Sequence, residues 1–397
     1  MLEQATRRPT ILFGVTSAQS LKLLGKIPFT MSKSGWDVHV VSASGPESLS
    51  VDLSGISHHV IEMERAPSPA KDLKAIGLWL RLLRGIQPDI VSIGTPKAAL
   101  LGLISARVLQ IPVRVYMLRG LRLEGSRGGW RVTLHLFEWL TSSSSTHIIA
   151  VSQSLKASYL ALRLSGNRKI TVLGRGSSHG VDVQRFEPQA HLMSSHKNAS
   201  LLAARKEGRA IVAFVGRFGR DKGAQTLVAC KQALEELSID HEFVIVGEIE
   251  DSPHYMDAMN STGKPVVRIL GSEDLSSLYP LFDLLLLPSK REGLPNVVLE
   301  AAASGVPSIV TNATGAVDSV VSGETGIVVP LGDEDAFVRA AIELLSNRTR
   351  AATMGEAARW WVRDHFDAEK VSQQHFEFYS SLFVGRKMVN SGPLGFR

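Results

Sequence analysis

Short apolar runs alternate with helical patterns along the whole chain, and this alternation constrains the fold more than any other feature. In the first half, the apolar runs are Thr10–Val15, Val38–Ser42, Ile90–Ser92, Val113–Tyr116 and His147–Val151. In the second half, they are Ala210–Val215, Glu242–Val246, Val266–Leu270, Leu284–Leu287 and Ser308–Val310. The helical patterns between them include Leu21–Met31, Leu73–Arg84, Ala98–Leu109, Gly223–Leu237 and Ala336–Leu345. Apolar strands that alternate with amphipathic helices form parallel sheets with crossover helices. The sequence therefore predicts an α/β protein with two Rossmann-like domains, whose ligands bind at the carboxyl ends of the strands.

The alternation is interrupted near residue 190. Residues 191–208 are polar and lack strong periodicity, so they are predicted to link an N-terminal domain (1–190) to a C-terminal domain (209–368). Residues 369–397 are predicted to form a C-terminal amphipathic helix and tail, with Tyr379 among the aromatic residues on one side of the helix.

Composition restricts the compartment and the partners. The single Cys230 excludes an internal disulfide and favours a buried helical thiol in a reducing compartment. The N-terminus lacks the apolar core of a signal peptide and no run is long enough to span a membrane, so we expect a cytoplasmic protein. Residues 1–190 contain 23 Lys and Arg against 12 Asp and Glu, a balance of +11, and the remainder has 21 against 26, a balance of −5. The basic half predicts an anionic partner, either a phosphorylated acceptor or a membrane surface, rather than nucleic acid.

Two carboxylates stand out in the segment SKREGLPNVVLEAAASGVPSIV. Glu300 is the only charged residue between Gly293 and Val317, and such an acid is costly to bury without a polar partner. Pro295 is placed to open a helix, which leaves Glu292 in the preceding loop and Glu300 about one turn inside. The helix N-terminus between them is an anion-binding arrangement, although a capped core helix with a solvated acid is the alternative.

A second polar segment, GRFGRDKG at residues 216–223, follows the predicted strand Ala210–Val215. Gly216 permits a tight turn, and Arg217 and Lys222 place two cations where a diphosphate would be neutralised. Taken alone, such a pair is more often two solvated loop cations.

The combination of GRFGRDKG with EGLPNVVLE at residues 292–300 resembles the retaining glycosyltransferases of family 4, which have the GT-B fold. Five further segments are similar to the branch that builds bacterial lipopolysaccharide, capsule and exopolysaccharide: TPKAALLG (95–102), YMLRGLRLEG (116–125), AVSQSLK (150–156), GRGSSHGVDVQRF (174–186) and FDLLLLPSKREG (282–293). The resemblance implies two Rossmann-like domains that face a deep cleft, with the C-terminal helix crossing back to the N-terminal domain.

The resemblance also implies site residues. Arg217 and Lys222 match the positions that hold the donor diphosphate, Glu300 matches the acid that binds the ribose, and Glu292 matches the acid that contacts the donor sugar. The implied donor-binding set is Gly216, Arg217, Lys222, Glu292, Gly293, Leu294, Pro295, Asn296, Val297 and Glu300. The implied donor is a nucleotide sugar, mostly a UDP-sugar, and the usual acceptor is a lipid-diphosphate-linked saccharide. Cations aimed at the departing diphosphate lower the barrier to transfer.

The sequence departs from the family at one position. Where many members carry a histidine after the strand that here reads VRVYMLRG, this chain has Arg119. A guanidinium is not a general base at neutral pH, so Arg119 is predicted to stabilise phosphate or sugar charge, with an ion pair to Glu124 as the alternative. The Trp- and Arg-containing stretch Leu118–Leu140 is predicted to lie against anionic lipid.

Other positions allow two interpretations. His179 either touches the donor or lies on a surface loop, and Gly14 follows the first strand, where a small residue lets backbone approach a ligand. Asp333–Glu334–Asp335 superficially resembles a metal-binding motif but is placed to begin a helix, so no catalytic metal or cofactor is expected. The alternatives to a transferase are a sugar-nucleotide-binding subunit without activity and a GT-B-fold epimerase. An NAD-dependent enzyme is disfavoured because GVTSAQS lacks the dinucleotide fingerprint.

Overall fold

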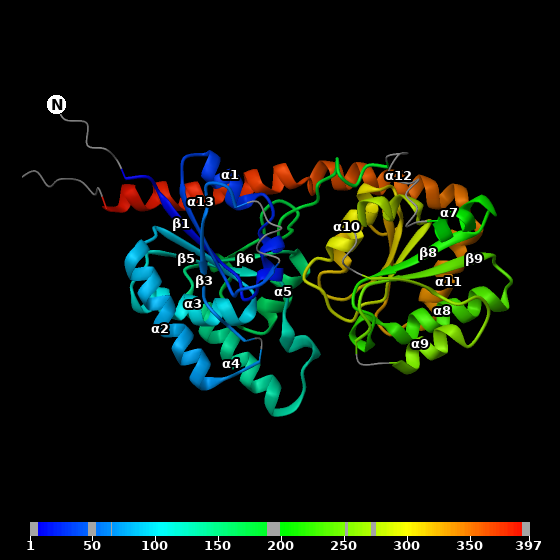
Figure 1. The fold of residues 1–397 in the computed structure, drawn as a ribbon, viewed down its shortest axis with the longest axis horizontal. Helices are drawn as coiled ribbons and strands as arrows, with labels where there is room; N and C mark the ends of the chain where they lie inside the picture. The colour runs from blue at the N-terminus through cyan, green and yellow to red at the C-terminus, as the bar shows by residue number, and fades with distance from the viewer. Residues whose placement is uncertain are drawn as a thin grey trace, which may run out of the picture. The chain divides into compact units, whose positions relative to one another are not determined.

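The computed structural model of the 397-residue chain describes residues 7–46, 53–64, 66–188, 199–250, 253–270 and 275–390. The chain divides into two compact units. Unit 1 comprises Met1–Gly180 together with Ala368–Arg397, and unit 2 comprises Val181–Asp367. Each unit contains one parallel sheet covered by helices on both faces (Figure 1).

Unit 1 is built on a seven-stranded sheet in the order β3-β2-β1-β4-β5-β6-β7. Its strands are β1 (Thr10–Gly14), β2 (Asp37–Ser42), β3 (Ser57–Val60), β4 (Ile90–Gly94), β5 (Val113–Leu118), β6 (His147–Ala150) and β7 (Ile170–Thr171). Helices α1 (Ile27–Lys33) and α13 (Ala368–Asn390) cover one face, and α2 (Pro69–Ile86), α3 (Pro96–Val108) and α4 (Gly128–Ser144) cover the other (Figure 1). The remaining elements used below are the 3₁₀ helices η1 (Ala18–Leu24) and η3 (Arg122–Gly125), and α5 (Gln153–Ala161).

Unit 2 is built on a six-stranded sheet in the order β10-β9-β8-β11-β12-β13. Its strands are β8 (Ala210–Val215), β9 (His241–Val246), β10 (Val267–Ile269), β11 (Leu284–Leu287), β12 (Ser308–Thr311) and β13 (Gly326–Val329). Helices α8 (Ala224–Glu236), α9 (Pro253–Asn260) and α11 (Glu334–Ser346) cover one face, and α10 (Asn296–Ala303) and α12 (Arg348–His365) cover the other (Figure 1). The unit also contains α7 (Ala199–Lys206) and the 3₁₀ turn η6 (Arg220–Lys222).

The central strands are buried along their whole length. Every residue of β1, β4, β8, β9 and β11 is buried. Strands covered on both faces read as continuous apolar runs, and all strand pairs here are parallel. The predicted fold class is therefore confirmed, and two strands, Ala210–Val215 and Leu284–Leu287, have the predicted bounds.

The structure also differs from the sequence prediction. The pattern Leu21–Met31 is not one helix, because Gly25 has a φ of +51° and separates η1 from α1, in which Pro28 occupies the first turn. Part of the segment 191–208 forms helix α7, which belongs to unit 2 and packs on β8. Among the helices that the structure describes, none combines the length and apolar character that a membrane span requires.

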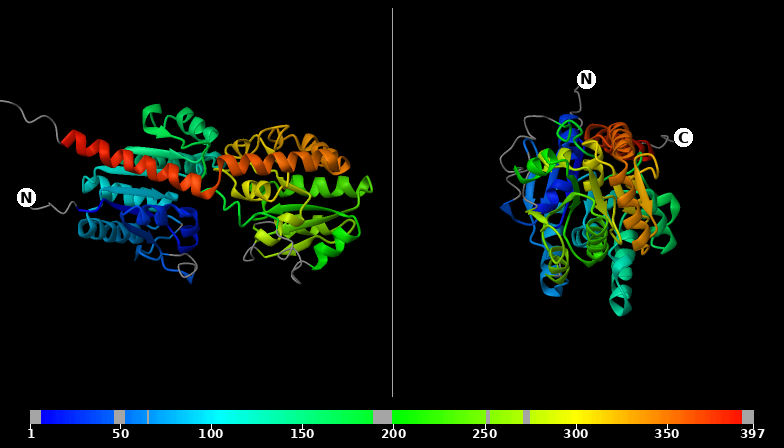
Figure 2. Two further views of the ribbon diagram at one scale, coloured as in Figure 1. Left: turned by 90° about the horizontal axis from the view of Figure 1, so that it is seen from above. Right: turned by 90° about the vertical axis from the view of Figure 1, so that its right-hand side faces the viewer.

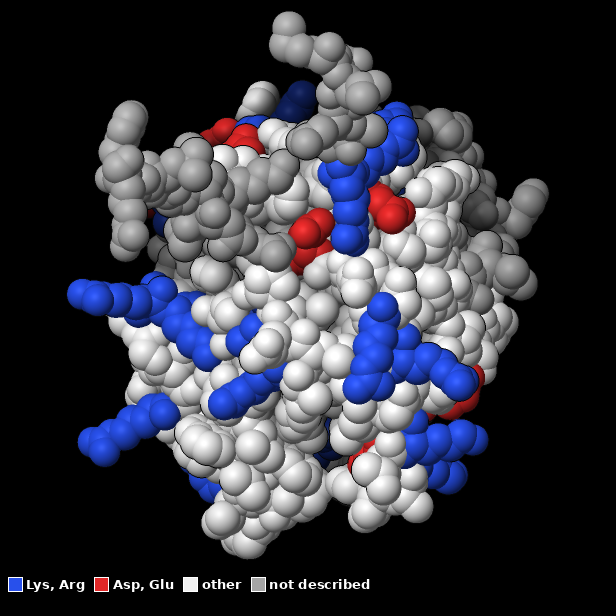
Figure 3. Space-filling view, turned by 90° about the vertical axis from the view of Figure 1, so that its left-hand side faces the viewer, with Lys and Arg blue, Asp and Glu red and all other residues white. Residues whose placement is uncertain are grey.

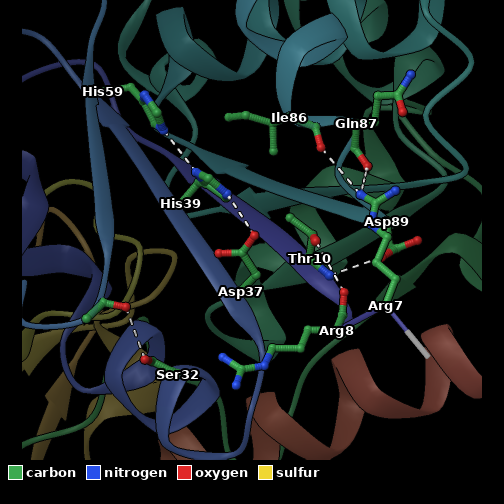
Figure 4. A network of polar contacts seen from close by, with 11 residues as sticks. Arg7, Arg8, Thr10, Ser32, Asp37, His39, His59, Ile86, Gln87 and Asp89 are labelled. Carbon is green, nitrogen blue, oxygen red and sulfur yellow. Dashed lines mark hydrogen bonds and ion pairs between the residues drawn. The ribbon is translucent and has the colours of Figure 1, made fainter. Parts of the chain in front are cut away.

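Polar contacts fix the amino ends of the unit 1 strands (Figure 4). The backbone N–H of Thr10 donates to Asp89 Oδ2 at 3.0 Å, and Arg7 Nη2 donates to the carbonyl of Gln87 at 2.7 Å, beyond the end of α2. On the neighbouring strands, His39 Nδ1 lies 2.9 Å from His59 Nε2. These contacts serve the fold, because ligands of parallel α/β sheets bind at the opposite, carboxyl edge.

Helix α13 packs on unit 1 along its length (Figures 1 and 2). Tyr379 on this helix is buried, lies edge-on to Phe13 of β1, and its hydroxyl lies 2.8 Å from Ser92 Oγ of β4. One aromatic side chain thus joins the end of the chain to the two central strands of the sheet.

We expect Tyr379→Ala to lower the free energy of unfolding of unit 1 by about 3–5 kcal/mol, because it leaves a cavity beside β1. Tyr379→Phe keeps the ring and is expected to cost about 1 kcal/mol, through the lost hydroxyl contact with Ser92. Denaturant unfolding measures both values, and the unfolding of unit 2 serves as the internal control. A loss below about 1 kcal/mol for Tyr379→Ala would show that α13 does not anchor unit 1.

Candidate functional site

The carboxyl edge of the unit 2 sheet brings the two predicted polar segments together. After β8, the chain turns at Gly216 (φ +144°) and enters η6, which ends at Lys222. Gly223 has a φ of +78°, and a Cβ at this position would lie 2.3 Å from the carbonyl oxygen of Pro288, just beyond β11. Only glycine allows this close approach, which holds Lys222 next to the loop that carries Glu292.

Lys222 and Glu292 form an ion pair at the centre of this edge. Lys222 Nζ lies 2.5 Å from Glu292 Oε1, and their side chains are only 22% and 13% exposed. Partly buried pairs of this kind are stronger than surface pairs, and breaking one leaves the other charge without a partner. The structure therefore joins a cation and an acid that are 70 residues apart in the sequence.

The loop that carries Glu292 is held by its own backbone. The N–H of Glu292 donates to the carbonyl of Thr314 at 2.9 Å. Gly315 has a φ of +75°, and a Cβ there would lie 2.2 Å from the carbonyl oxygen of Gly293. This close packing fixes the backbone at Glu292, and Lys222 then orients the Glu292 carboxylate.

Helix α10 begins at Asn296, one residue after the predicted Pro295, which is its N-cap residue and makes no side-chain capping hydrogen bond. The positive end of the helix dipole therefore adjoins the loop with Glu292. Glu300 lies one turn inside, where the hydroxyl of Tyr279 donates to its Oε2 at 2.9 Å. Burial and the adjacent Glu300 raise the pKa of Tyr279 well above its usual value, so the phenol stays protonated as a donor.

Arg217 lies at the same edge but pairs elsewhere. Its Nη1 lies 2.5 Å from Glu250 Oε1, in the loop that follows β9, and both side chains are about half exposed. Exposed pairs of this kind contribute little to stability, so Glu250 holds Arg217 weakly. The guanidinium thus remains available to a more strongly charged ligand such as a diphosphate.

The acidic triplet at residues 333–335 begins a helix, as predicted. Asp333 is the N-cap residue of α11, and its Oδ1 accepts from the N–H of Ala336 at 2.9 Å. Within the described ranges, no three His, Cys, Asp or Glu side chains gather into a group that would hold a metal ion. Cys230 is buried on α8, and burial raises the pKa of its thiol to about 12, which confirms the predicted buried thiol.

Arg119 follows β5 at the carboxyl edge of the unit 1 sheet. Its Nε donates to Ser178 Oγ at 2.6 Å and its Nη2 to the carbonyl of Leu23 at 3.2 Å, so the alternative ion pair with Glu124 is not formed. Its Nη1 is buried without a hydrogen-bond partner among the described residues, and burial lowers the pKa of Arg119 to about 10. A buried cation without a carboxylate partner is costly and favours an anionic ligand.

Gly94 makes room for the Arg119 guanidinium. A Cβ at Gly94, the last residue of β4, would lie 1.6 Å from Arg119 Nη1. Gly94 at the end of β4 therefore leaves the space that the long side chain of Arg119, just after the neighbouring strand β5, occupies. The sequence predicted a role for Arg119 but gave no indication of its dependence on Gly94.

His179 and Gly14 also lie in unit 1, and the structure shows what each of them packs against. His179 packs on Gly25, and burial, followed by the nearby Arg119, lowers its pKa to about 4, so it is not an exposed loop histidine. At Gly14, a Cβ would lie 3.0 Å from both Ile93 and Trp79. The small size of Gly14 thus serves core packing, and its contact with a ligand stays a prediction.

A buried acid on α4 was missed by the sequence analysis. Glu138 is 7% exposed, and the hydroxyls of Tyr116 and Tyr159 lie 3.2 and 3.4 Å from its Oε2. Burial raises the pKa of Glu138 to about 7. The only sequence signal was an acid within an otherwise uncharged, aromatic-rich stretch, VTLHLFEWL.

Comparisons with known proteins identify the family. The family described as glycosyl transferases group 1 matches residues 209–347, and glycosyltransferase family 4 matches residues 30–185. The capsular polysaccharide biosynthesis glycosyltransferase CapM of Staphylococcus aureus is 34% identical over 372 residues, which cover 93% of this chain and 96% of CapM. The UDP-Gal:alpha-D-GlcNAc-diphosphoundecaprenol alpha-1,3-galactosyltransferase of Escherichia coli is 27% identical and covers 88% of this chain and 90% of its own. The chain belongs to glycosyltransferase family 4.

Solved structures agree on the fold. HepE from Anabaena, crystallised with UDP, has a TM-score of 0.75 at 18% identity, and the match covers 94% of this chain and all of HepE. WaaG, a glycosyltransferase involved in lipopolysaccharide biosynthesis, has a TM-score of 0.68 at 16% identity, with 91% of this chain and 98% of WaaG covered. The fold is GT-B, and with the family assignment it places the chain among the glycosyltransferases.

Glu138 predicts a pH dependence of stability. Its folded pKa of about 7 lies above the ordinary 4.5, so the folded state keeps a proton that the unfolded state loses. The free energy of unfolding should therefore fall as pH rises from about 4.5 to 7, by up to roughly 3 kcal/mol. We expect Glu138→Gln to remove this decrease, as measured by denaturant unfolding between pH 5 and 8. Glu377→Gln, at an exposed position of α13, is the control. Parallel pH profiles for wild type and Glu138→Gln would contradict the prediction.

Proposed function

We propose that this chain is a retaining, metal-independent glycosyltransferase that moves a hexosyl or N-acetylhexosaminyl group from a UDP-sugar to a lipid-diphosphate-linked saccharide. The observation that carries the proposal is the Lys222–Glu292 pair at 2.5 Å, beside the N-terminus of α10. The names of two relatives support the finer points: one is a glycosyltransferase of capsular polysaccharide biosynthesis, and the other transfers galactose from UDP-Gal to a diphosphoundecaprenol-linked GlcNAc.

The donor chemistry follows from charge. As the bond between the anomeric carbon and the diphosphate oxygen breaks, negative charge grows on the departing nucleotide diphosphate. Lys222, Arg217 and the N-terminus of α10 stabilise that charge, while Glu292 orients the sugar and Glu300 binds the ribose hydroxyls. Tyr279 holds Glu300 in place through its hydroxyl. Preorganised charges of this kind lower the barrier without reorganisation during the reaction.

The acceptor attacks on the face from which the diphosphate leaves. Its hydroxyl oxygen forms the new bond to the anomeric carbon, and its proton passes to an oxygen of the leaving phosphate, so the anomeric configuration is retained. This route needs no enzymic general base, in keeping with Arg119 at the position where many relatives have histidine. Arg119 instead attracts the anionic group of the acceptor.

Location at a membrane is part of the proposal. Helix α4 exposes Trp130, Val132, Leu136 and Trp139, each with 45–70% of its surface accessible. Exposed tryptophans on an amphipathic helix beside arginines favour the interface of an anionic bilayer. We place the enzyme on the cytoplasmic face of the membrane, where the lipid-linked acceptor is found.

The main test is turnover with nucleotide sugars. We expect Lys222→Ala and Glu292→Ala each to reduce sugar transfer by a factor of about 100 or more, because each removes one charge of the buried pair and its contact with the donor. Thermal stabilisation by UDP-, GDP- and ADP-sugars identifies the donor, and Lys222→Ala should lose that stabilisation.

Lys290→Ala is the matched control, because Lys290 is an exposed lysine in the same loop and makes no contact with Glu292 among the described residues. Full turnover in both Lys222→Ala and Glu292→Ala would overturn the proposed site. A wild-type protein that binds a nucleotide sugar but neither transfers nor hydrolyses it would favour a non-catalytic binding subunit.

A second test exploits the Gly94–Arg119 contact. We expect Arg119→Ala to lower transfer by about 100-fold, and Gly94→Ala to lower it similarly, because the added methyl group displaces the guanidinium. The double variant should be no worse than Arg119→Ala alone, since both changes act on one interaction. Additive losses in the double variant would show that Gly94 acts independently, and unchanged melting temperatures exclude misfolding.

A further inference from the structure

Unit 1 contains a small apolar pocket between α3 and α4, which has no part in the sites described above. Its volume is about 80 Å³, and its walls include Leu100 of α3, Leu123 of η3, and Trp130, Leu134 and Phe137 of α4. Pockets for nucleotides or saccharides are roughly 300 Å³ or larger, so this one fits a short hydrocarbon segment instead.

The charged groups that line the pocket do not make it a sugar site. Lys97 Nζ lies 2.6 Å from both carboxylate oxygens of Asp72, and Glu138 is held by two tyrosine hydroxyls. Each acid therefore has a partner within the protein. Among the charged side chains of the lining, Arg122 differs, because it is exposed and makes no ion pair with a described carboxylate.

The pocket reaches the surface at the start of α4, where Trp130 lines the pocket and is also 45% exposed. Leu136 and Trp139, on another side of the same helix, are 51% and 50% exposed. Arg127 and Arg131 flank the start of α4. Exposed apolar side chains beside cations are complementary to an anionic lipid. The side of the molecule drawn in Figure 3, which is the left-hand side of Figure 1, also has Lys and Arg spread among uncharged residues and few Asp or Glu.

The pocket lies at the reactive edge of the unit 1 sheet. Helix α3 follows β4, which ends at Gly94, and η3 follows β5, three residues after Arg119. Arg119, which lies next to Gly94, and Arg122, at the pocket mouth, therefore both follow β5 within a few residues. A ligand with an anionic group joined to an apolar chain would match this order of features.

We propose that the α3–α4 pocket receives the first segment of the hydrocarbon chain of the lipid-diphosphate acceptor, with Arg122 binding the diphosphate at the pocket mouth. This inference rests on the proposed function and adds the site at which the enzyme recognises the lipid part of its acceptor. The chain leaves the pocket past Trp130 and enters the bilayer there. Bulk phospholipid is a poorer match, because its phosphate would have no reason to lie beside Arg119 at the sheet edge.

The experiment compares two acceptors with the same diphosphate-linked saccharide, one with a long polyisoprenyl chain and one with a single methyl group in place of the chain. Leu100→Trp fills the pocket from α3, and Arg122→Glu reverses the charge at its mouth without touching the core. We expect Leu100→Trp to raise KM for the long-chain acceptor about tenfold and to leave KM for the methyl acceptor unchanged. Arg122→Glu should raise KM for both, since both carry the diphosphate.

Leu237→Trp and Arg168→Glu are the matched controls at exposed positions away from the pocket, and neither should change either KM. An unchanged preference for the long chain in Leu100→Trp overturns the proposal, as does an equal rise in KM for both acceptors. Binding to vesicles of phosphatidylcholine and phosphatidylglycerol without acceptor should be the same in Leu100→Trp and wild type. A loss there would assign the pocket to bulk lipid instead.

Failure of the proposed function is distinguishable from failure of the pocket. Wild-type protein that transfers to neither acceptor overturns the proposed function. In that case, direct titration of the same two acceptors still decides the inference. Tighter binding of the long chain that Leu100→Trp abolishes supports the pocket, and chain-independent binding overturns it.

Discussion

The parallel arrangement of the strands is the constraint on which every functional feature depends. All strands of a parallel sheet end at one edge, so the loops that follow them must meet there. In unit 2 this brings Lys222, after β8, to Glu292, after β11, with Gly223 allowing the close approach to Pro288. In unit 1 it brings Arg119, after β5, to Gly94 at the end of β4. Residues distant in sequence become neighbours because of strand direction, and glycines at the contact points set how close they come.

The sequence predicts best where burial is uniform. Strands β8 and β11 were predicted to the residue because strands buried on both faces read as unbroken apolar runs. Helix α4 was missed because its outer face exposes Val132, Leu136 and Trp139, so apolar residues surround the helix and obscure the 3.6-residue period. Helix α7 was assigned to a linker because it is short and its flanks are polar.

The family motif identified Lys222, Glu292 and Glu300 as candidates. Their supporting partners, Tyr279 for Glu300 and Glu250 for Arg217, come from segments without a motif, and only the tertiary structure reveals them.

Arg119 shows how one buried cation changes the electrostatics around it. Burial, together with the nearby Arg119, lowers the pKa of His179 and that of His375 to about 4. Both histidines are therefore neutral at physiological pH, and the positive charge is concentrated on the guanidinium. Arg119 Nη1 as a donor and His375 Nε2 as an acceptor are each buried without a partner among the described residues. Such groups are costly in a finished core, and they are tolerated where a ligand or ordered water completes the bonding.

The two halves of the chain differ in net charge, so in the proposed function the acceptor and the donor are attracted over different distances. Residues 1–190 have a balance of +11, which attracts an anionic acceptor or membrane over distances comparable with the Debye length, roughly 8–10 Å. The remaining residues have a balance of −5 and would repel a nucleotide diphosphate on the same scale. In the proposed function, donor binding then rests on short-range contacts, for which the partly buried Lys222–Glu292 pair and the α10 N-terminus are the candidates. Such contacts discriminate by geometry instead of charge alone, so we propose that they select the donor sugar, while the basic half attracts the anionic acceptor.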